Sequence, residues 1–122
     1  MKKYIAFLFL SLLIGTLSFA DTKPTIVDVR EWDEIKKGMI KDAVWLPLSE
    51  VELNSPDAQK RIGKLEKKSE IQLYCKSGRR AGKVGEILEK QGFTVKNLGG
   101  YDDLKKNGLP TVIPPKKPEP VI

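Results

Sequence analysis

The chain has a single cysteine, and the residues after it determine what chemistry it could do. Cys75 is followed by a short run of cations and small residues: Lys76, Ser77, Gly78, Arg79 and Arg80. A glycine lets the backbone bend so that successive amide N–H groups can turn inward, and the three cations add positive charge. Such surroundings lower the pKa of a thiol and stabilise its thiolate. The segment therefore predicts a reactive cysteine in an anion-holding loop.

The rest of the composition limits the chemistry further. The sequence contains no histidine, which excludes Ser-His-Asp and Cys-His catalysis and removes the commonest zinc ligand. With one cysteine no disulfide can form within the chain, and the resolving Cys-x-x-Cys partner of a thiol-disulfide exchanger is missing. We expect no metal and no cofactor. A buried structural thiol is the alternative, but a cysteine followed by so many polar residues is poorly suited to burial.

Alternating β-branched and amphipathic segments must position this cysteine. We expect strands over residues 25–29, 43–46, 70–74 and 93–98, and helices over 31–37, 55–67, 81–91 and 101–106, with a turn at Gly99 and Gly100. Strands that alternate with helices predict an α/β fold with a largely parallel sheet and helices on both faces.

Ligands bind at the carboxyl ends of strands in such sheets. Cys75 follows one strand there, and Asp28 and Arg30 end another. We therefore expect Asp28 and Arg30 to orient the cysteine loop by ion pairing, with a purely structural salt bridge as an equal alternative.

The two ends of the chain differ from this pattern. Residues 1–20 combine Lys2 and Lys3, an apolar centre, and small side chains at Ser18 and Ala20, which is typical of a signal peptide cleaved after Ala20. An uncleaved membrane anchor is the alternative, since about 17 apolar residues are at the lower limit for spanning a bilayer. Residues 110–122 are rich in proline and predict an extended or disordered tail.

The net charge of +6 comes from lysines spread over the whole chain. A mild basic excess of this kind favours small anionic substrates but does not indicate nucleic-acid binding. We expect a periplasmic monomer without stable membrane association once the signal peptide is removed.

Five segments, taken in order along the chain, carry a resemblance to a known family: residues 26–31, 38–48, 74–80, 98–101 and 108–110. Over residues 21–109 the chain resembles single-domain rhodanese-like proteins, closest to small periplasmic thiosulfate sulfurtransferases. Members often have a histidine after the glycine at position 38, where this chain has Met39. We expect this departure to affect local packing rather than chemistry.

The resemblance implies sulfur transfer in two steps. The Cys75 thiolate takes the outer sulfur of thiosulfate as a persulfide and then gives it to a thiophilic acceptor such as cyanide. The amides of residues 76–80 would hold the persulfide, and Lys76, Arg79 and Arg80 would bind the donor, with Arg80 foremost. A non-catalytic persulfide carrier would need the same cysteine. A cysteine phosphatase would need the pattern Cys-x5-Arg, which places an arginine at position 81. This chain has Ala81 there.

Overall fold

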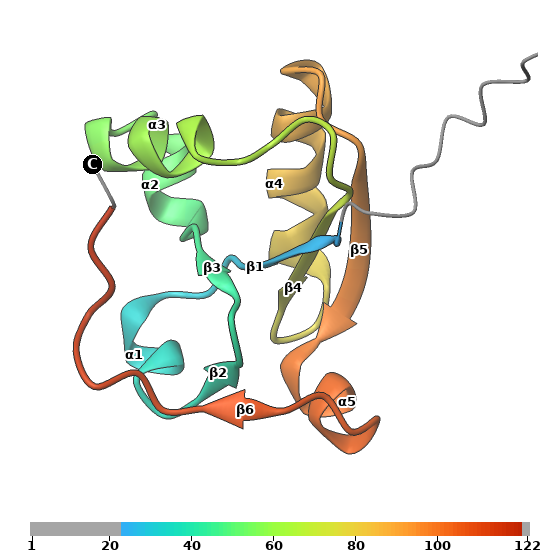
Figure 1. Ribbon diagram of the computed structural model, residues 1–122. Coiled ribbons are helices and arrows are strands. Elements are labelled where there is room, and N and C mark those ends of the chain that lie inside the picture. The colour runs from blue at the N-terminus through green and yellow to red at the C-terminus, as the bar shows by residue number, and fades with distance from the viewer. Residues whose placement is uncertain (1–22, 121–122) are drawn as a thin grey trace, which may run out of the picture.

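A parallel sheet of four short strands lies at the centre of residues 23–120, the part of the chain that the computed structural model describes (Figure 1). Its strand order is β3-β1-β4-β5, with β1 at Thr25–Asp28, β3 at Val44–Trp45, β4 at Ile71–Cys75 and β5 at Val95–Gly100. All three pairings are parallel. The α/β fold with a parallel sheet, expected from the sequence, is confirmed.

Alternating side chains give the sheet two apolar faces. On β1, Val27 packs with Leu73 of β4 in the larger core cluster. The neighbouring residues Ile26 and Tyr74 point the other way and join a second, smaller cluster. Both faces therefore need a cover.

Helices provide that cover. The larger cluster receives apolar residues from three of them: α2 (Leu48–Glu52), α3 (Pro56–Gly63) and α4 (Arg79–Lys90). In α4 the buried positions Ala81, Val84, Gly85 and Leu88 follow helical spacing. The smaller cluster is covered by α5 (Tyr101–Lys106), through Leu104, while α1 (Trp32–Ile35) buries Ile35 against Trp45.

Two helices differ from the sequence-based expectation. The helix expected over residues 55–67 starts as predicted, with Ser55 Oγ accepting from the Ala58 amide at 3.0 Å, but ends at Gly63. Glycine has low helix propensity, which explains the earlier end. Helix α2 was not predicted. Pro47 ends the β3 segment, but its φ of −67° also suits the start of a helix, and it is the N-cap of α2.

The proline-rich tail is ordered by contacts with the domain. Residues Thr111–Val112 form β6, which pairs antiparallel with β2 (Met39–Ile40). The chain then runs past α1 towards α3 (Figure 1), where Arg61 Nη2 donates to the Pro118 carbonyl at 2.7 Å. From the sequence we expected an extended or disordered tail, and neither of these contacts was predicted.

A bulge in β5 places two glycines beside Cys75. Leu73 pairs with Asn97, but Tyr74 pairs with Gly99 and Cys75 with Gly100, so Leu98 is an extra residue in the ladder. The expected turn at Gly99 and Gly100 is therefore wrong: both belong to β5. Strand β5 therefore runs through the bulge, where Gly99 has a φ of 90°, directly to the start of α5 at Tyr101.

Two expectations concern membranes and export. Within residues 23–120 the structure has no helix of the length and apolar character needed to span a bilayer. The expected signal peptide, residues 1–20, lies outside the described residues.

We predict that Gly100→Ala destabilises the fold. Gly100 is buried, and a Cβ there would overlap the backbone carbonyl of Lys76, which cannot move as a side chain tip can. Overpacking of this kind typically costs about 1–3 kcal/mol in the free energy of unfolding. Urea denaturation followed by circular dichroism would measure it.

The matched control is Gly63→Ala. A Cβ at Gly63 meets no atom within 4 Å at the end of α3, so we expect a stability equal to or up to about 1 kcal/mol above that of the wild type. Equal effects of the two variants would contradict the close approach at Gly100.

Candidate active site

Cys75 lies where the central strand β4 turns into α4. It is the last residue of the strand, and three residues later Gly78 is the N-cap of the helix, with a left-handed φ of 95°. The Gly78 amide donates a hydrogen bond to Cys75 Sγ at 2.9 Å. Because the first N–H groups of a helix have no partner within it, they are free to point at a sulfur anion placed there.

The backbone around Sγ favours the thiolate. Burial by itself raises the pKa of the Cys75 thiol, but backbone hydrogen bonds outweigh burial and bring the pKa below its ordinary value. The amides of Ala81, Ser77, Gly78 and Arg80 all lower this pKa, and among them the Gly78 amide makes the hydrogen bond to Sγ at 2.9 Å. Four converging N–H groups thus do what an imidazolium does in cysteine enzymes that have histidine. We call this set the amide ring.

The cysteine is more enclosed than the sequence indicated. Its exposed fraction is 0%, and it packs in the larger core cluster, where we expected an accessible thiol. The reason is geometric: residues 76–78 fold over the sulfur and pack against Gly100, which brings their backbone rather than their polar side chains to Sγ. Burial here places the thiol against the start of α4 and does not separate it from polar groups.

The loop cations do not all face the same way. Lys76, Ser77 and Arg79 are exposed. Arg80, which the sequence analysis placed foremost in donor binding, instead forms a two-pronged ion pair with Glu34 of α1, at 2.6 and 2.7 Å. The hydrogen bond with Arg80 lowers the pKa of Glu34, and the same bond raises the pKa of Arg80. Arg80 therefore fixes α4 to α1.

Asp28 and Arg30 pair with each other inside the protein. The shortest contact is 2.8 Å, and both side chains are buried. Arg30 Nη2 also donates to the Gly38 carbonyl at 2.7 Å, and its guanidinium lies over the Tyr101 ring, 4.2 Å from the centroid. The pair thus ties β1 to the segment before β2 and to α5. From the sequence, orienting residues 76–80 and a purely structural salt bridge were equal alternatives for this pair, and the partners that the structure shows for it lie outside that loop.

Two large side chains near this edge, Trp45 and Met39, are packed in the core. Trp45 is 3% exposed and donates from Nε1 to the Arg30 carbonyl at 2.7 Å. Met39, which stands where relatives often have histidine, is buried beside Trp45 and Ile35. Its side chain fills the core between α1 and β3. Within the described residues, the structure shows no contact between Met39 and the amide ring.

A cavity of about 250 Å³ opens beside the loop, at the carboxyl ends of the strands. It is lined by Arg30, Glu34, Lys37, Gly38, Lys76, Tyr101 and Asp102. Lys37 and Lys76 are its exposed cations. An anion that reaches the loop could therefore approach through this cavity.

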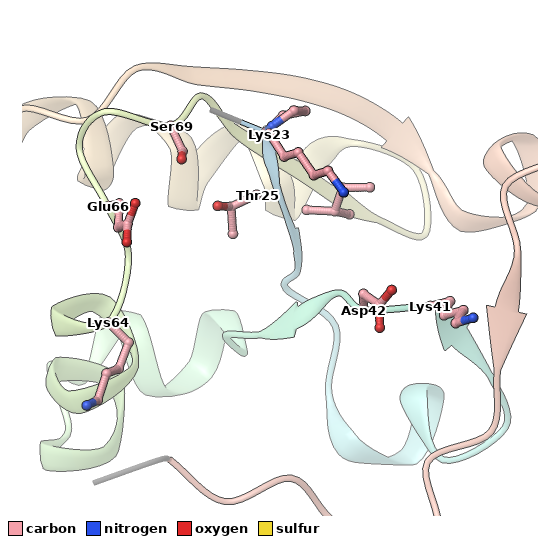
Figure 2. A pocket seen from close by; sticks show the side chains of 9 residues that line it. Lys23, Thr25, Lys41, Asp42, Lys64, Glu66 and Ser69 are labelled. Carbon is pink, nitrogen blue, oxygen red and sulfur yellow. The ribbon is translucent and has the colours of Figure 1, made fainter. Parts of the chain in front are cut away.

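A larger cavity, of about 680 Å³, lies at the opposite edge of the sheet (Figure 2). Figure 2 shows the side chains that line it, which include Thr25 at the start of β1 and Ser69 just before β4. None of the site residues expected from the sequence lines it. Within the described residues, no group of three or more Cys, Asp or Glu side chains is placed to hold a metal ion.

Two polar residues near the loop were not found from the sequence. The sequence around Glu34 gives little indication of this role, because a carboxylate in the first turn of a short helix is usually a capping residue. Glu34 does cap the helix as well, since it accepts from the Glu31 amide at 3.0 Å. Asn97 carries no signal at all. Its side chain contacts the loop from β5, 19 residues further along the chain.

Comparisons with known proteins find relatives for most of this chain. A family model described as the rhodanese-like domain matches residues 16–107. The chain is 36% identical to a protein named sulfurtransferase from Allochromatium vinosum, over 78% of this chain and 85% of the relative. It is 32% identical to thiosulfate sulfurtransferase PspE of Escherichia coli, over 64% of this chain and 71% of that protein.

A solved structure shows the same fold. The rhodanese_3-like domain of the Alr3790 protein from Anabaena superposes with a TM-score of 0.63 at 27% identity, over 74% of this chain and 99% of that domain. Not every relative is of this size: the chain covers 60% of the length of a relative from Schizosaccharomyces pombe that is 36% identical to it.

We predict that Arg30→Ala strongly destabilises the protein. The change leaves the Asp28 carboxylate buried without its cation, which typically costs about 3–5 kcal/mol in the free energy of unfolding. Urea denaturation would measure the loss. As a control, Lys36→Ala removes an exposed ion pair with Asp33 and should change stability by no more than about 0.5 kcal/mol. Comparable losses in the two variants would mean that the buried pair contributes no more than a surface one.

A second prediction concerns the acidity of the thiol. Since the pKa of Cys75 is lowered, its thiolate should persist below the ordinary cysteine value of about 8.5, and alkylation by iodoacetamide should slow only as the pH falls through the lower pKa. The measurement is the rate of mass gain against pH in the folded protein. The same chain unfolded in urea is the control and should titrate near the ordinary value. Coincident profiles would contradict the amide ring.

Proposed function

Because the chain belongs to the rhodanese-like domain family, a family of sulfurtransferases, we propose that it moves a sulfane sulfur from thiosulfate to a thiophilic acceptor through a persulfide on Cys75. The observation that carries the proposal is the amide ring around Sγ at the start of α4. A persulfide is an anion at physiological pH, so the groups that favour the thiolate would also favour Cys–S–S⁻.

The first step is a displacement at sulfur. The Cys75 thiolate attacks the outer sulfur of thiosulfate, a new Sγ–S bond forms, and the S–S bond of thiosulfate breaks. Sulfite leaves with the electron pair of that bond. Because Sγ accepts the Gly78 amide directly, the new outer sulfur would take over hydrogen bonds now made to Sγ. The charge moves by one atom and stays among the same donors, which lowers the barrier to its transfer.

The second step regenerates the enzyme. The acceptor, cyanide for example, attacks the outer sulfur, and the Sγ–S bond breaks with its electron pair returning to Cys75. Thiocyanate leaves and the thiolate is restored. Dividing the transfer between two displacements on one nucleophile is covalent catalysis, and neither step requires a proton to move. This suits a chain that has no histidine.

The exposed cations of the loop are suited to binding the donor. Lys76 and Arg79 form no ion pair with any other residue of the described range 23–120, while Arg80 is held by Glu34. We therefore assign attraction of the dianionic donor to Lys76 and Arg79, and positioning of the helix to Arg80. Lys37 lines the same cavity as Lys76 and adds to the positive charge at its mouth.

Phosphate-ester hydrolysis is a poorer fit to this loop. Position 81, where a cysteine phosphatase has its arginine, holds Ala81, and that residue is fully buried under the loop. A larger loop would be needed to surround a tetrahedral phosphate. A persulfide carrier that delivers sulfur to another protein has the same geometry as the enzyme, and only turnover distinguishes the two.

For the place of action we propose the periplasm. The proposal rests on the signal-peptide pattern of residues 1–20.

We predict that thiosulfate adds one sulfur, about 32 Da, to the wild-type protein and that cyanide removes it, because the covalent intermediate carries one sulfur atom. Intact mass spectrometry measures both changes. Cys75→Ser is the control and should gain nothing. If this variant gained the same mass, Cys75 would not be the residue that carries the sulfur. If the wild-type protein were loaded once but did not release thiocyanate repeatedly, the result would favour a persulfide carrier over an enzyme.

A further inference from the structure

The side chain of Asn97 bridges two backbone segments that meet beside Cys75. Its Nδ2 donates to the Gly78 carbonyl at 2.7 Å, and its Oδ1 accepts from the Gly99 amide at 2.9 Å. Gly78 is the residue whose own amide donates to Sγ, and Gly99 lies in the bulged part of β5. One neutral side chain therefore joins the amide ring to the edge strand.

Gly78 needs such a constraint because its conformation is unusually free. It has a φ of 95°, a region that glycine enters easily and also leaves easily. Its carbonyl accepts from the Gly82 amide at 3.0 Å and from Asn97 Nδ2, so both its position and its orientation are fixed from outside the loop. The carbonyl and the N–H of Gly78 lie in adjacent peptide planes joined at its Cα, so a fixed carbonyl limits the φ and ψ changes that would let the N–H turn away from Sγ.

The surroundings leave room for this amide and for little else. A Cβ at Gly78 would lie 3.2 Å from Gly99 Cα and 3.5 Å from Asn97 Oδ1, and one at Gly82 would lie 3.7 Å from Asn97 Nδ2. The Asn97 side chain therefore lies within van der Waals range of the backbone at Gly78, the N-cap of α4, and at Gly82 in its first turn. The bulge at Leu98 provides the matching contact, because it shifts the Gly99 amide into reach of Oδ1.

We propose that Asn97 is a positioning residue for sulfur transfer: its amide holds Gly78 in the conformation that directs the Gly78 N–H at Cys75 Sγ. The inference rests on the proposed function, in which that N–H stabilises first the thiolate and then the persulfide. Asn97 itself contacts neither Cys75 Sγ nor the outer sulfur of the persulfide. Its effect reaches Cys75 only through the Gly78 backbone.

The charged groups near the sulfur stay unchanged when Asn97 is replaced. They are Lys76, Arg79 and Arg80 on the loop and helix α4, Glu31 at the N-cap of α1 and Glu34 within it, Arg30 between β1 and α1, and Asp102 on α5. Asparagine is neutral, so Asn97→Ala alters none of them. A change in the titration of Cys75 would therefore report the geometry of the amide ring.

The test is the pH profile of iodoacetamide alkylation for Asn97→Ala. We expect its midpoint to rise by about one pH unit, which lowers the rate about tenfold at a pH below both midpoints. Asn97 is exposed, so its truncation leaves the core intact, and circular dichroism should show a folded protein. The control is Gln72→Ala, which removes another side-chain amide, at the end of β4 away from Cys75. That amide donates to the Glu70 carboxylate, so its loss should leave the profile unchanged.

A second variant separates the two contacts of Asn97. Asn97→Asp keeps an acceptor for the Gly99 amide but has no donor for the Gly78 carbonyl. Measured at about 1 M salt, where the Debye length is about 3 Å and the added charge is screened, it should resemble Asn97→Ala. A wild-type profile for Asn97→Asp would show that the Gly78 contact is unimportant and overturn the proposal.

The outcomes also separate this inference from the proposed function. A low midpoint in the wild type with no shift in Asn97→Ala would overturn the role of Asn97 alone. An ordinary cysteine midpoint in the wild type would overturn the amide ring and, with it, both proposals. A low wild-type midpoint that rises in Asn97→Ala and Asn97→Asp but not in Gln72→Ala would support them.

Discussion

Backbone N–H groups that converge on one sulfur atom are the interaction on which the rest of this structure depends. Burial of Cys75 works against its charge, and the amide ring more than compensates. Backbone donors have two advantages in this role: they carry no net charge that must itself be neutralised, and a helix start supplies several at once. Their weakness is that they hold an anion only while the loop keeps its shape.

The surrounding contacts are best understood as constraints on that shape. Each fixes the loop or its neighbours from a different element: Asn97 from β5, Glu34 from α1 through Arg80, and Gly100 by close packing on Lys76. The buried pair of Asp28 and Arg30 works one layer further away, joining β1 to α5 and the segment before β2. A loop rich in polar side chains is thus held mainly through its backbone.

This arrangement also explains how a cysteine can be both enclosed and suited to reaction. A thiol surrounded by aliphatic groups alone would stay protonated, because desolvation disfavours the charged form. Cys75 belongs to an aliphatic cluster that includes Leu73 of β4 and Val84 of α4, and its Sγ accepts from the Gly78 amide at the start of α4. The polar side chains of residues 76–79 remain in solvent, where Lys76 and Arg79 can attract an anion without screening the amide ring.

The sequence by itself determined the α/β fold and the position of Cys75 at the end of a central strand, because both follow from patterns within about ten residues. It could not determine the partner of Arg80, 46 residues away in Glu34, or the role of Asn97, 19 residues from Gly78. It also missed the pairing of β6 with β2. Such contacts depend on how distant elements pack, and a side chain's partner leaves no periodic signal in the chain.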